Sequence, residues 1–190
     1  MKLFFTILLL TLTVSAVADI ELKFNRRGEF VSPDMLLQQR GLKAYRNGHK
    51  SEAMRLLKSS SKFGNDLSKY LTALIYFEDK NFTTGHAWLK LIRNPVEDSD
   101  KLIKKYDSQF NKSELASSNA TFNQLENEYN DEANLQRRKK WLNSIRVVGS
   151  HMKGINALSN RNIVLGVGDA GLPVVNTRVR DIVSEYVNNL

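Results

Sequence analysis

The glycine-rich stretch near the C-terminus has the spacing most often associated with chemistry. Gly166-Val-Gly168-Asp-Ala-Gly171 matches the glycine pattern of dinucleotide-binding loops and follows a predicted strand, Asn162 to Leu165. In those loops a helix begins directly after the glycines, and its N-terminus holds the pyrophosphate. Here Pro173 and two valines stand where that helix should begin, and no βαβ unit surrounds the motif. We therefore interpret the stretch as a glycine-rich turn and predict no nucleotide cofactor.

The residue types and their spacing give little support for a metal site or a catalytic nucleophile. The three histidines, His49, His86 and His151, have none of the spacings of a zinc site, and the chain contains no cysteine. We interpret His49 and His86 as solvated residues in or near turns. No serine lies in a nucleophile elbow, and the acidic residues are scattered along the chain. The sequence therefore predicts no metal site, no cofactor and no identifiable catalytic residue.

An enzymatic alternative stays open around the glycine-rich stretch. If the protein is a small exported enzyme or accessory factor acting on an envelope polymer, its site would lie where this stretch meets the helices. The first candidates would be Ser150, His151 and Asp169. The sequence does not fix their mutual geometry, so a non-enzymatic function is favoured.

The strongest run of charge is Arg137-Arg138-Lys139-Lys140, directly before Trp141 and Leu142. Four consecutive residues spread around a helix axis and do not form one stripe. We expect Trp141 and Leu142 on the buried side. The run is then either a solvated helix face or a contact for an anionic partner such as lipid head groups, polysaccharide or an acidic protein.

The first eighteen residues have the features of a secretory signal peptide. Lys2 is followed by an almost wholly apolar run from Leu3 to Val14, and small residues in an Ala-x-Ala arrangement end at Ala18. The run is shorter than the roughly 20 residues of a membrane span. We predict cleavage after Ala18, with no transmembrane anchor in the mature chain. The protein would then be exported, to the periplasm or out of the cell.

The mature chain would run from Asp19 to Leu190. It loses only Lys2 among the charged residues, so its net charge falls from +8 to +7. Its length suits one domain with a core that needs no disulfide. The basic charge is compatible with an anionic envelope surface, whereas nucleic acid is a poor partner for an exported protein.

The stretch from Leu36 to Leu91 contains two copies of one pattern at a constant offset, so that Leu42 in the first corresponds to Leu74 in the second. Small residues lie twelve apart in each copy, Gly41 and Ala53 in the first and Ala73 and Gly85 in the second. Two antiparallel helices joined by a short turn can cross closely only where small residues let them approach. This pattern predicts two helical hairpins of a repeat protein.

Caps and apolar periodicity place the individual helices. Ser32-Pro33-Asp34 is a helix start, Asn47-Gly48 and Asn94-Pro95 are helix ends, and Asp66 can cap a helix. Residues 20–24 are compatible with a short strand or with an arm that packs through Phe24 and Phe30. The predicted repeat helices cover residues 33–46, 50–62, 67–77 and 83–92, further helices occupy 96–146, and a last one covers 177–188.

The repeat region resembles tetratricopeptide and Sel1-like repeats. The resemblance lies in Gly41-x-x-Ala44-Tyr45, in Glu52-Ala53-x-x-Leu56-Leu57 and in Gly85-His86-Ala87-Trp88-Leu89-Lys90-Leu91. In particular, the chain resembles small exported Sel1-like proteins of Gram-negative bacteria, which combine a signal peptide, a short helical-repeat region and a charged helical tail. The resemblance implies a protein-binding function and brings no catalytic residues with it.

We therefore predict an all-α fold, a short α-α superhelix of TPR/Sel1-like hairpins with capping helices. Its expected function is that of a protein-protein interaction module or adaptor in the cell envelope. The candidate partner-binding residues are Tyr45, Tyr70 and Tyr76 of the repeats and Arg137, Arg138, Lys139 and Lys140 of the basic run. The expected regions are a signal peptide (1–18), an N-terminal arm (19–31), helical repeats (32–95), additional helices (96–148) and a glycine-rich segment with a C-terminal helix (149–190).

Overall fold

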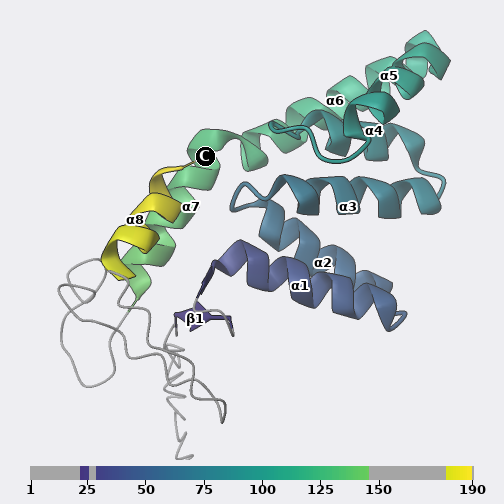
Figure 1. Ribbon diagram of the computed structural model, residues 1–190. Coiled ribbons are helices and arrows are strands. Elements are labelled where there is room, and N and C mark those ends of the chain that lie inside the picture. Colours follow the sequence, from purple (N-terminus) through teal and green to yellow (C-terminus); the bar gives the residue numbers. More distant parts are fainter. Residues whose placement is uncertain (1–21, 26–28, 146–178, 190) are drawn as a thin grey trace, which may run out of the picture.

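A computed structural model describes residues 22–25, 29–145 and 179–189, and these residues are almost all helical (Figure 1). Helices α1 and α2 form one hairpin, α3 and α4 form a second, and the long helix α6 leads from the second hairpin to α7 and α8. The elements are β1 Lys23–Phe24, β2 Phe30–Val31, α1 Pro33–Arg46, α2 Lys50–Ser61, α3 Asp66–Glu78, α4 Phe82–Lys90, α5 Ser99–Gln109, α6 Lys112–Tyr129, α7 Asp131–Ser144 and α8 Val179–Asn188.

The small residues allow each hairpin to close, as their spacing predicts. A Cβ atom at Gly41 would lie 2.9 Å from Leu57 Cγ and 3.4 Å from the carbonyl oxygen of Ala53. In the second hairpin a Cβ atom at Gly85 would lie 3.1 Å from the carbonyl oxygen of Ala73. Ala53 and Ala73 are themselves fully buried. The predicted close crossing of the helices is therefore confirmed in both hairpins.

The turns of the two hairpins have the same hydrogen bonds at equivalent positions of the two copies. In the first turn the backbone amides of Asn47, Gly48 and His49 donate to the carbonyls of residues 43, 45 and 44. In the second, residues 79, 80 and 81 donate to 75, 77 and 76. Both turns need a residue with positive φ, which is Gly48 at +79° in the first and Lys80 at +59° in the second.

The second hairpin lies between the first hairpin and α6. Outside their own hairpin, α3 packs on α2, whereas α4 packs mainly on α6 and makes a smaller contact with α5. Trp88 on α4 is buried, and its ring meets that of Tyr129 on α6 edge to face at 4.8 Å. The largest apolar cluster therefore lies around α3, α4 and α6.

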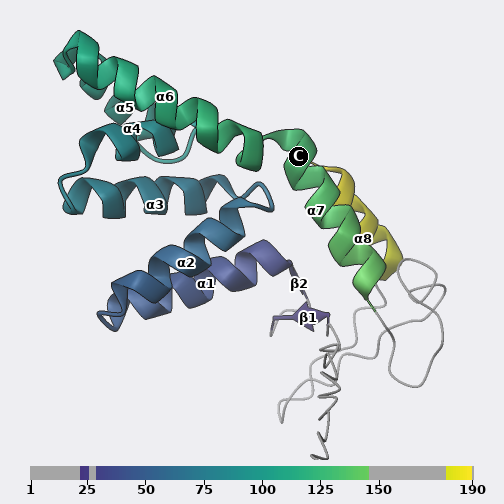
Figure 2. The ribbon, with the colours of Figure 1, turned by 180° about the vertical axis from the view of Figure 1, so that it is seen from behind.

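Helices α7 and α8 return to the first hairpin, so the two ends of the chain's described part meet (Figure 2). The two-stranded antiparallel sheet of β1 and β2 lies beside them. The ring of Phe30 lies 6.1 Å from that of Trp141 on α7 and 5.8 Å from that of Tyr186 on α8. Val183 of α8 is fully buried with Ile145. The apolar face of α8 thus packs on α7 and the N-terminal arm.

The predicted boundaries of the repeat helices are confirmed to within two residues, but one cap is wrong. Asn65 caps α3 through its side-chain oxygen, which accepts from Ser68 N at 2.8 Å. Asp66 follows this cap, and its carboxylate instead accepts from the buried Lys69 and from the backbone amide of Asn94. The predicted signal peptide and the glycine-rich stretch lie outside the described residues. None of the helices in residues 22–25, 29–145 and 179–189 has the length and apolarity needed to cross a bilayer.

Candidate functional site

An apolar groove of about 400 Å³ lies between α1 and α3. Leu42 and Tyr45 form its α1 wall, and Leu57 of α2 contributes from the first hairpin. Its α3 wall follows one face of that helix. Nearly all of the lining is therefore aliphatic or aromatic, and the α3 residues are Leu71, Leu74, Ile75, Phe77 and Glu78.

A polar network joins the two hairpins at one end of this groove. The hydroxyl of Tyr45 donates to the carboxylate of Glu78. Lys50 Nζ lies 3.1 Å from Glu78 Oε2 and 2.5 Å from Asp79 Oδ1. These four side chains connect the turn of the first hairpin to the end of α3. They hold the two walls of the groove together without filling it.

The network also changes the acid-base properties of its members. The hydrogen bond from Tyr45, together with Lys50, lowers the pKa of the Glu78 carboxyl below its usual range. The same Tyr45–Glu78 bond raises the pKa of the tyrosine hydroxyl. The hydrogen bond to Asp79, and to a smaller extent that to Glu78, raises the pKa of the Lys50 ammonium group. At neutral pH these shifts leave Glu78 ionised and keep the proton on Tyr45 and on Lys50, which are the states in which the network forms.

The three candidate tyrosines occupy different environments. Tyr45 is 37% exposed at the rim of the groove. Tyr76 is partly buried, and its hydroxyl accepts a hydrogen bond of 2.8 Å from Lys58 Nζ. Tyr70 is buried in the core around Trp88, and this burial raises the pKa of its hydroxyl. Of the three, only Tyr45 reaches the groove.

The basic run splits into two structural and two exposed residues. Arg138 is only 6% exposed, and its guanidinium donates to the carbonyls of Phe63 at the end of the first hairpin and of Tyr186 and Asn189 in and after α8. Arg137 donates to the carbonyl of Glu128 at 2.6 Å. Lys139 and Lys140 are exposed. The run therefore presents half of its charge to solvent, and Arg138 holds α7 against the end of the first hairpin and α8.

A histidine of α4, an aspartate of α5 and a serine of α6 come together, although their sequence positions gave no sign of it. His86 Nδ1 lies 2.9 Å from Ser118 Oγ, and His86 Nε2 lies 3.3 Å from Asp107 Oδ1. These are the residue types of a hydrolase triad. His86 is 1% exposed and Ser118 is fully buried, however, so a substrate cannot reach the hydroxyl.

The predicted solvated position of His86 is therefore wrong. The helix α6 covers α4 and buries the imidazole, and this burial lowers its pKa. His49, in contrast, is exposed at the turn before α2, as expected. Within the described residues no group of three or more histidine or acidic side chains could hold a metal ion. Ser150, His151 and Asp169 lie outside those residues and stay a prediction.

The groove was not predicted from the sequence, although the sequence contains a signal for it. Leu42 and Leu74 are equivalent positions of the two copies, and both line the groove. Their equivalence indicated a shared face of α1 and α3. It did not indicate that this face would be left open. Comparisons with known protein families, with curated proteins and with solved structures find no match to this chain.

Proposed function

We propose that the chain is an exported helical-repeat protein that binds a partner protein in the cell envelope through the groove between α1 and α3. The proposal takes the hairpins as units of a short TPR/Sel1-like superhelix. Its support is the constant offset between the copies, which the turns share and which continues into α5. Asp66 and Lys69 pair at 2.7 Å. Asp98 and Lys101, which follow these two residues at the same offset that separates the two copies, pair at 2.6 Å.

The observation that carries the proposal is the contrast between two neighbouring helix interfaces. Between α3 and α5, the ring of Tyr106 stacks on that of Phe77 at 4.6 Å, and Leu102 and Ile103 pack against the core. Between α1 and α3, the position equivalent to Tyr106 is Leu74, which has no aromatic ring, and the groove remains. Its volume lies within the roughly 300–1,000 Å³ of typical ligand sites.

The lining defines the chemistry of the partner. An aliphatic and aromatic groove gains free energy by burying a large apolar side chain, and a charged side chain would lose its hydration there. The Tyr45 ring at the rim offers further apolar contact, while its hydroxyl is already satisfied by Glu78. We infer an extended peptide segment of a partner protein that places a leucine- or phenylalanine-sized side chain in the groove.

A crosslinking pull-down from envelope extract tests the proposal, with the chain from Asp19 to Leu190 as bait. Leu42→Gln puts a polar group in the groove wall at a half-buried position. Leu115→Gln is the matched control, since Leu115 is also half-buried but lies on α6. We expect a captured protein that Leu42→Gln loses and Leu115→Gln retains. Equal capture by both variants would contradict a groove-mediated function.

A second pair of substitutions separates the groove from the basic run. Lys139→Glu and Lys140→Glu reverse the exposed half of that run and leave the buried Arg138 in place. The proposal expects this double variant to capture the same partner as the unchanged chain. Loss of the partner would instead place binding on α7.

A further inference from the structure

One edge of the molecule gathers the hairpin turns and is rich in exposed aromatic and cationic side chains. The turns after α1 and α3 meet through the Lys50–Asp79 contact, and the junction of α5 and α6 lies at the same edge, on the right of Figure 1. We call this surface the turn edge. Its members are Tyr45, Arg46, Lys80, Phe82, Lys105 and Lys112.

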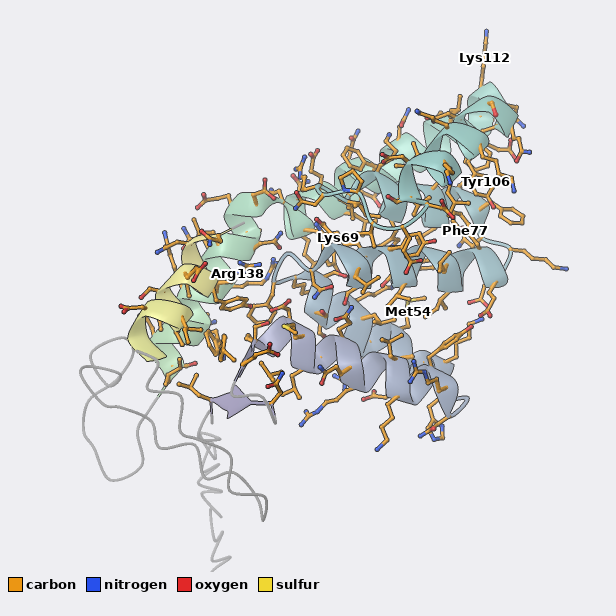
Figure 3. All side chains as sticks on the ribbon, viewed as in Figure 1. Met54, Lys69, Phe77, Tyr106, Lys112 and Arg138 are labelled. Atoms are coloured by element: carbon orange, nitrogen blue, oxygen red, sulfur yellow. The ribbon has the colours of Figure 1, made fainter. Side chains whose placement is uncertain are left out.

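The turn edge exposes apolar surface that a protein in water has no need to expose. Among the described residues, three large apolar side chains are exposed, and two of them, Tyr45 (37%) and Phe82 (43%), are on this edge. Phe82 is the outer ring of a stack, 6.4 Å from Phe77 and 5.9 Å from Tyr106. Figure 3 shows Phe77 and Tyr106 close together at this side of the molecule. The stack holds the exposed ring on a rigid base.

The cations of the turn edge are not neutralised within the described part of the chain. Arg46, Lys80 and Lys112 are exposed and form no ion pair or side-chain hydrogen bond there, and Lys112 projects away from the fold in Figure 3. Lys105 lies over the ring of Tyr106 at 5.6 Å. Among the neighbouring acids, Glu78 and Asp79 share the single cation Lys50, Glu114 binds the N-terminus of α6, and the half-exposed Asp107 lies beside the His86 imidazole. The four cations Arg46, Lys80, Lys105 and Lys112 still outnumber the three negative charges that Lys50 does not balance. The free charge of this edge is therefore positive.

Lys80 occupies a backbone position that does not favour lysine. Its φ of +59° lies in the left-handed region, where glycine is preferred, and the equivalent residue of the first turn is Gly48. The second turn therefore carries a backbone strain that the first turn avoids. This lysine places a cation two residues before Phe82, whose ring is exposed. Strain of this kind is a pointer to function.

We propose that the turn edge, which shares Tyr45 with the rim of the groove, docks on the surface of an anionic lipid bilayer. Aromatic side chains favour the water–lipid interface, where their rings enter the head-group region. Lysine and arginine close to that surface are attracted by anionic head groups. A soluble polyanion would use the cations, but it would not account for the exposed phenylalanine.

Vesicle co-sedimentation of the chain from Asp19 to Leu190, which contains every described residue, tests this inference. The vesicles contain about one-third phosphatidylglycerol in phosphatidylethanolamine, with pure phosphatidylcholine for comparison. We expect binding to the anionic vesicles only, weakened strongly at about 1 M salt because of screening. No binding to the anionic vesicles, or equal binding to both kinds, would overturn the proposal.

Lys80→Gly is the decisive variant, because it removes a charge from the edge while relieving the strained φ. Misfolding therefore cannot explain a loss of binding. We expect its partition to fall about five-fold, and the matched change Lys139→Gln on α7, at the other end of the molecule, to have no effect. Equal effects of the two variants would show that binding follows net charge and would contradict a defined edge.

Phe82→Ser distinguishes a bilayer from a polyanion. A bilayer-docking edge predicts weaker vesicle binding for Phe82→Ser and unchanged binding to soluble dextran sulfate. Vesicle binding that is unaffected by Phe82→Ser would leave only the attraction of the cations for any anionic surface, and the proposal would be wrong. Unchanged far-ultraviolet circular dichroism of the variant would show that its helices still form.

Discussion

The two hairpins share one backbone plan but differ in what surrounds them. Their turn hydrogen bonds match residue by residue, and each closes on a glycine–alanine crossing. The second hairpin is enclosed by α6 and by the rings of α5. The first is held at one end by Arg138 of α7 and leaves the groove open along α1 and α3. The shared plan thus accounts for the two hairpins, and the differences between them mark the candidate surfaces.

The largest departure is at equivalent positions near the start of α1 and α3. Leu37 in the first hairpin corresponds to Lys69 in the second, where the ammonium group is 1% exposed and binds Asp66 and the carbonyl of Leu91. Lys69→Leu would make the second hairpin resemble the first but leave the Asp66 carboxylate without its cation. We expect the free energy of unfolding to fall by about 3 kcal/mol in urea denaturation.

Lys101 follows Lys69 at the same offset as Lys69 follows Leu37, and it provides the control for Lys69. Lys101 pairs with Asp98 at the same spacing but is 84% exposed. Lys101→Leu should leave the urea midpoint unchanged, because an exposed pair is screened by water. A comparable loss in both variants would show that burial is not what distinguishes the two pairs.

The end contact of the first hairpin should respond to loss of Arg138. Arg138→Met removes the guanidinium that lies over the ring of Tyr186, and it leaves the carbonyls of Phe63, Tyr186 and Asn189 without their donor. We expect a loss of about 2–3 kcal/mol in unfolding free energy. Faster hydrogen exchange in α8 than in α3 would show that the C-terminal helices detach first. A change confined to α3 would contradict the assigned contact.

The glycines of the two crossings should differ in their tolerance of alanine. A Cβ at Gly85 would lie 2.4 Å from the ring of Phe77, which is stacked against Tyr106. At Gly41 it would meet the flexible side chain of Leu57, and alanine favours a helix by about 1 kcal/mol over glycine. We expect Gly85→Ala to destabilise by about 2 kcal/mol and Gly41→Ala to be near neutral by thermal unfolding. The reverse order would contradict the packing of the second hairpin.

Burial of His86 makes the second hairpin sensitive to acid. Burial lowers the pKa of this imidazole more than Asp107 raises it, and Lys90 adds to the lowering. The unfolded chain, with a histidine pKa of about 6.5, therefore takes up this proton first as the pH falls. Stability should decline below that pH, and less so in His86→Gln, when urea midpoints are compared from neutral to mildly acid pH. An identical decline in both chains would assign the acid sensitivity elsewhere.

The smallest expected effect is a reciprocal exchange at the two turns. Lys80→Gly should stabilise the protein by about 0.5–1 kcal/mol, and Gly48→Lys should destabilise it by a similar amount, because both positions have positive φ. Differential scanning calorimetry of the two variants measures both shifts. Shifts of the same sign would contradict the equivalence of the turns.

Local patterns predicted the helices and their crossings, whereas long-range contacts were beyond them. Gly41 and Gly85 mark the crossings because small residues at fixed spacing have a direct steric meaning. Arg138 was misjudged as a candidate for surface binding, because a run of cations does not reveal which distant carbonyls one of them will reach. His86 was placed in solvent because its own neighbours in sequence cannot show that α6 will cover it. The groove was missed because the sequence does not show which face of α1 and α3 the other helices will leave uncovered.

Site-specific photocrosslinking most directly tests the claim that the groove binds a partner. A benzophenone side chain replaces Tyr45 at the groove rim in one variant and the exposed Gln124 of α6 in another, and both are irradiated in envelope extract. We predict one protein adduct from position 45 that disappears when Leu42→Gln is added, and none of that size from position 124. The same adduct from both positions, or an adduct from position 45 that survives Leu42→Gln, would contradict the account.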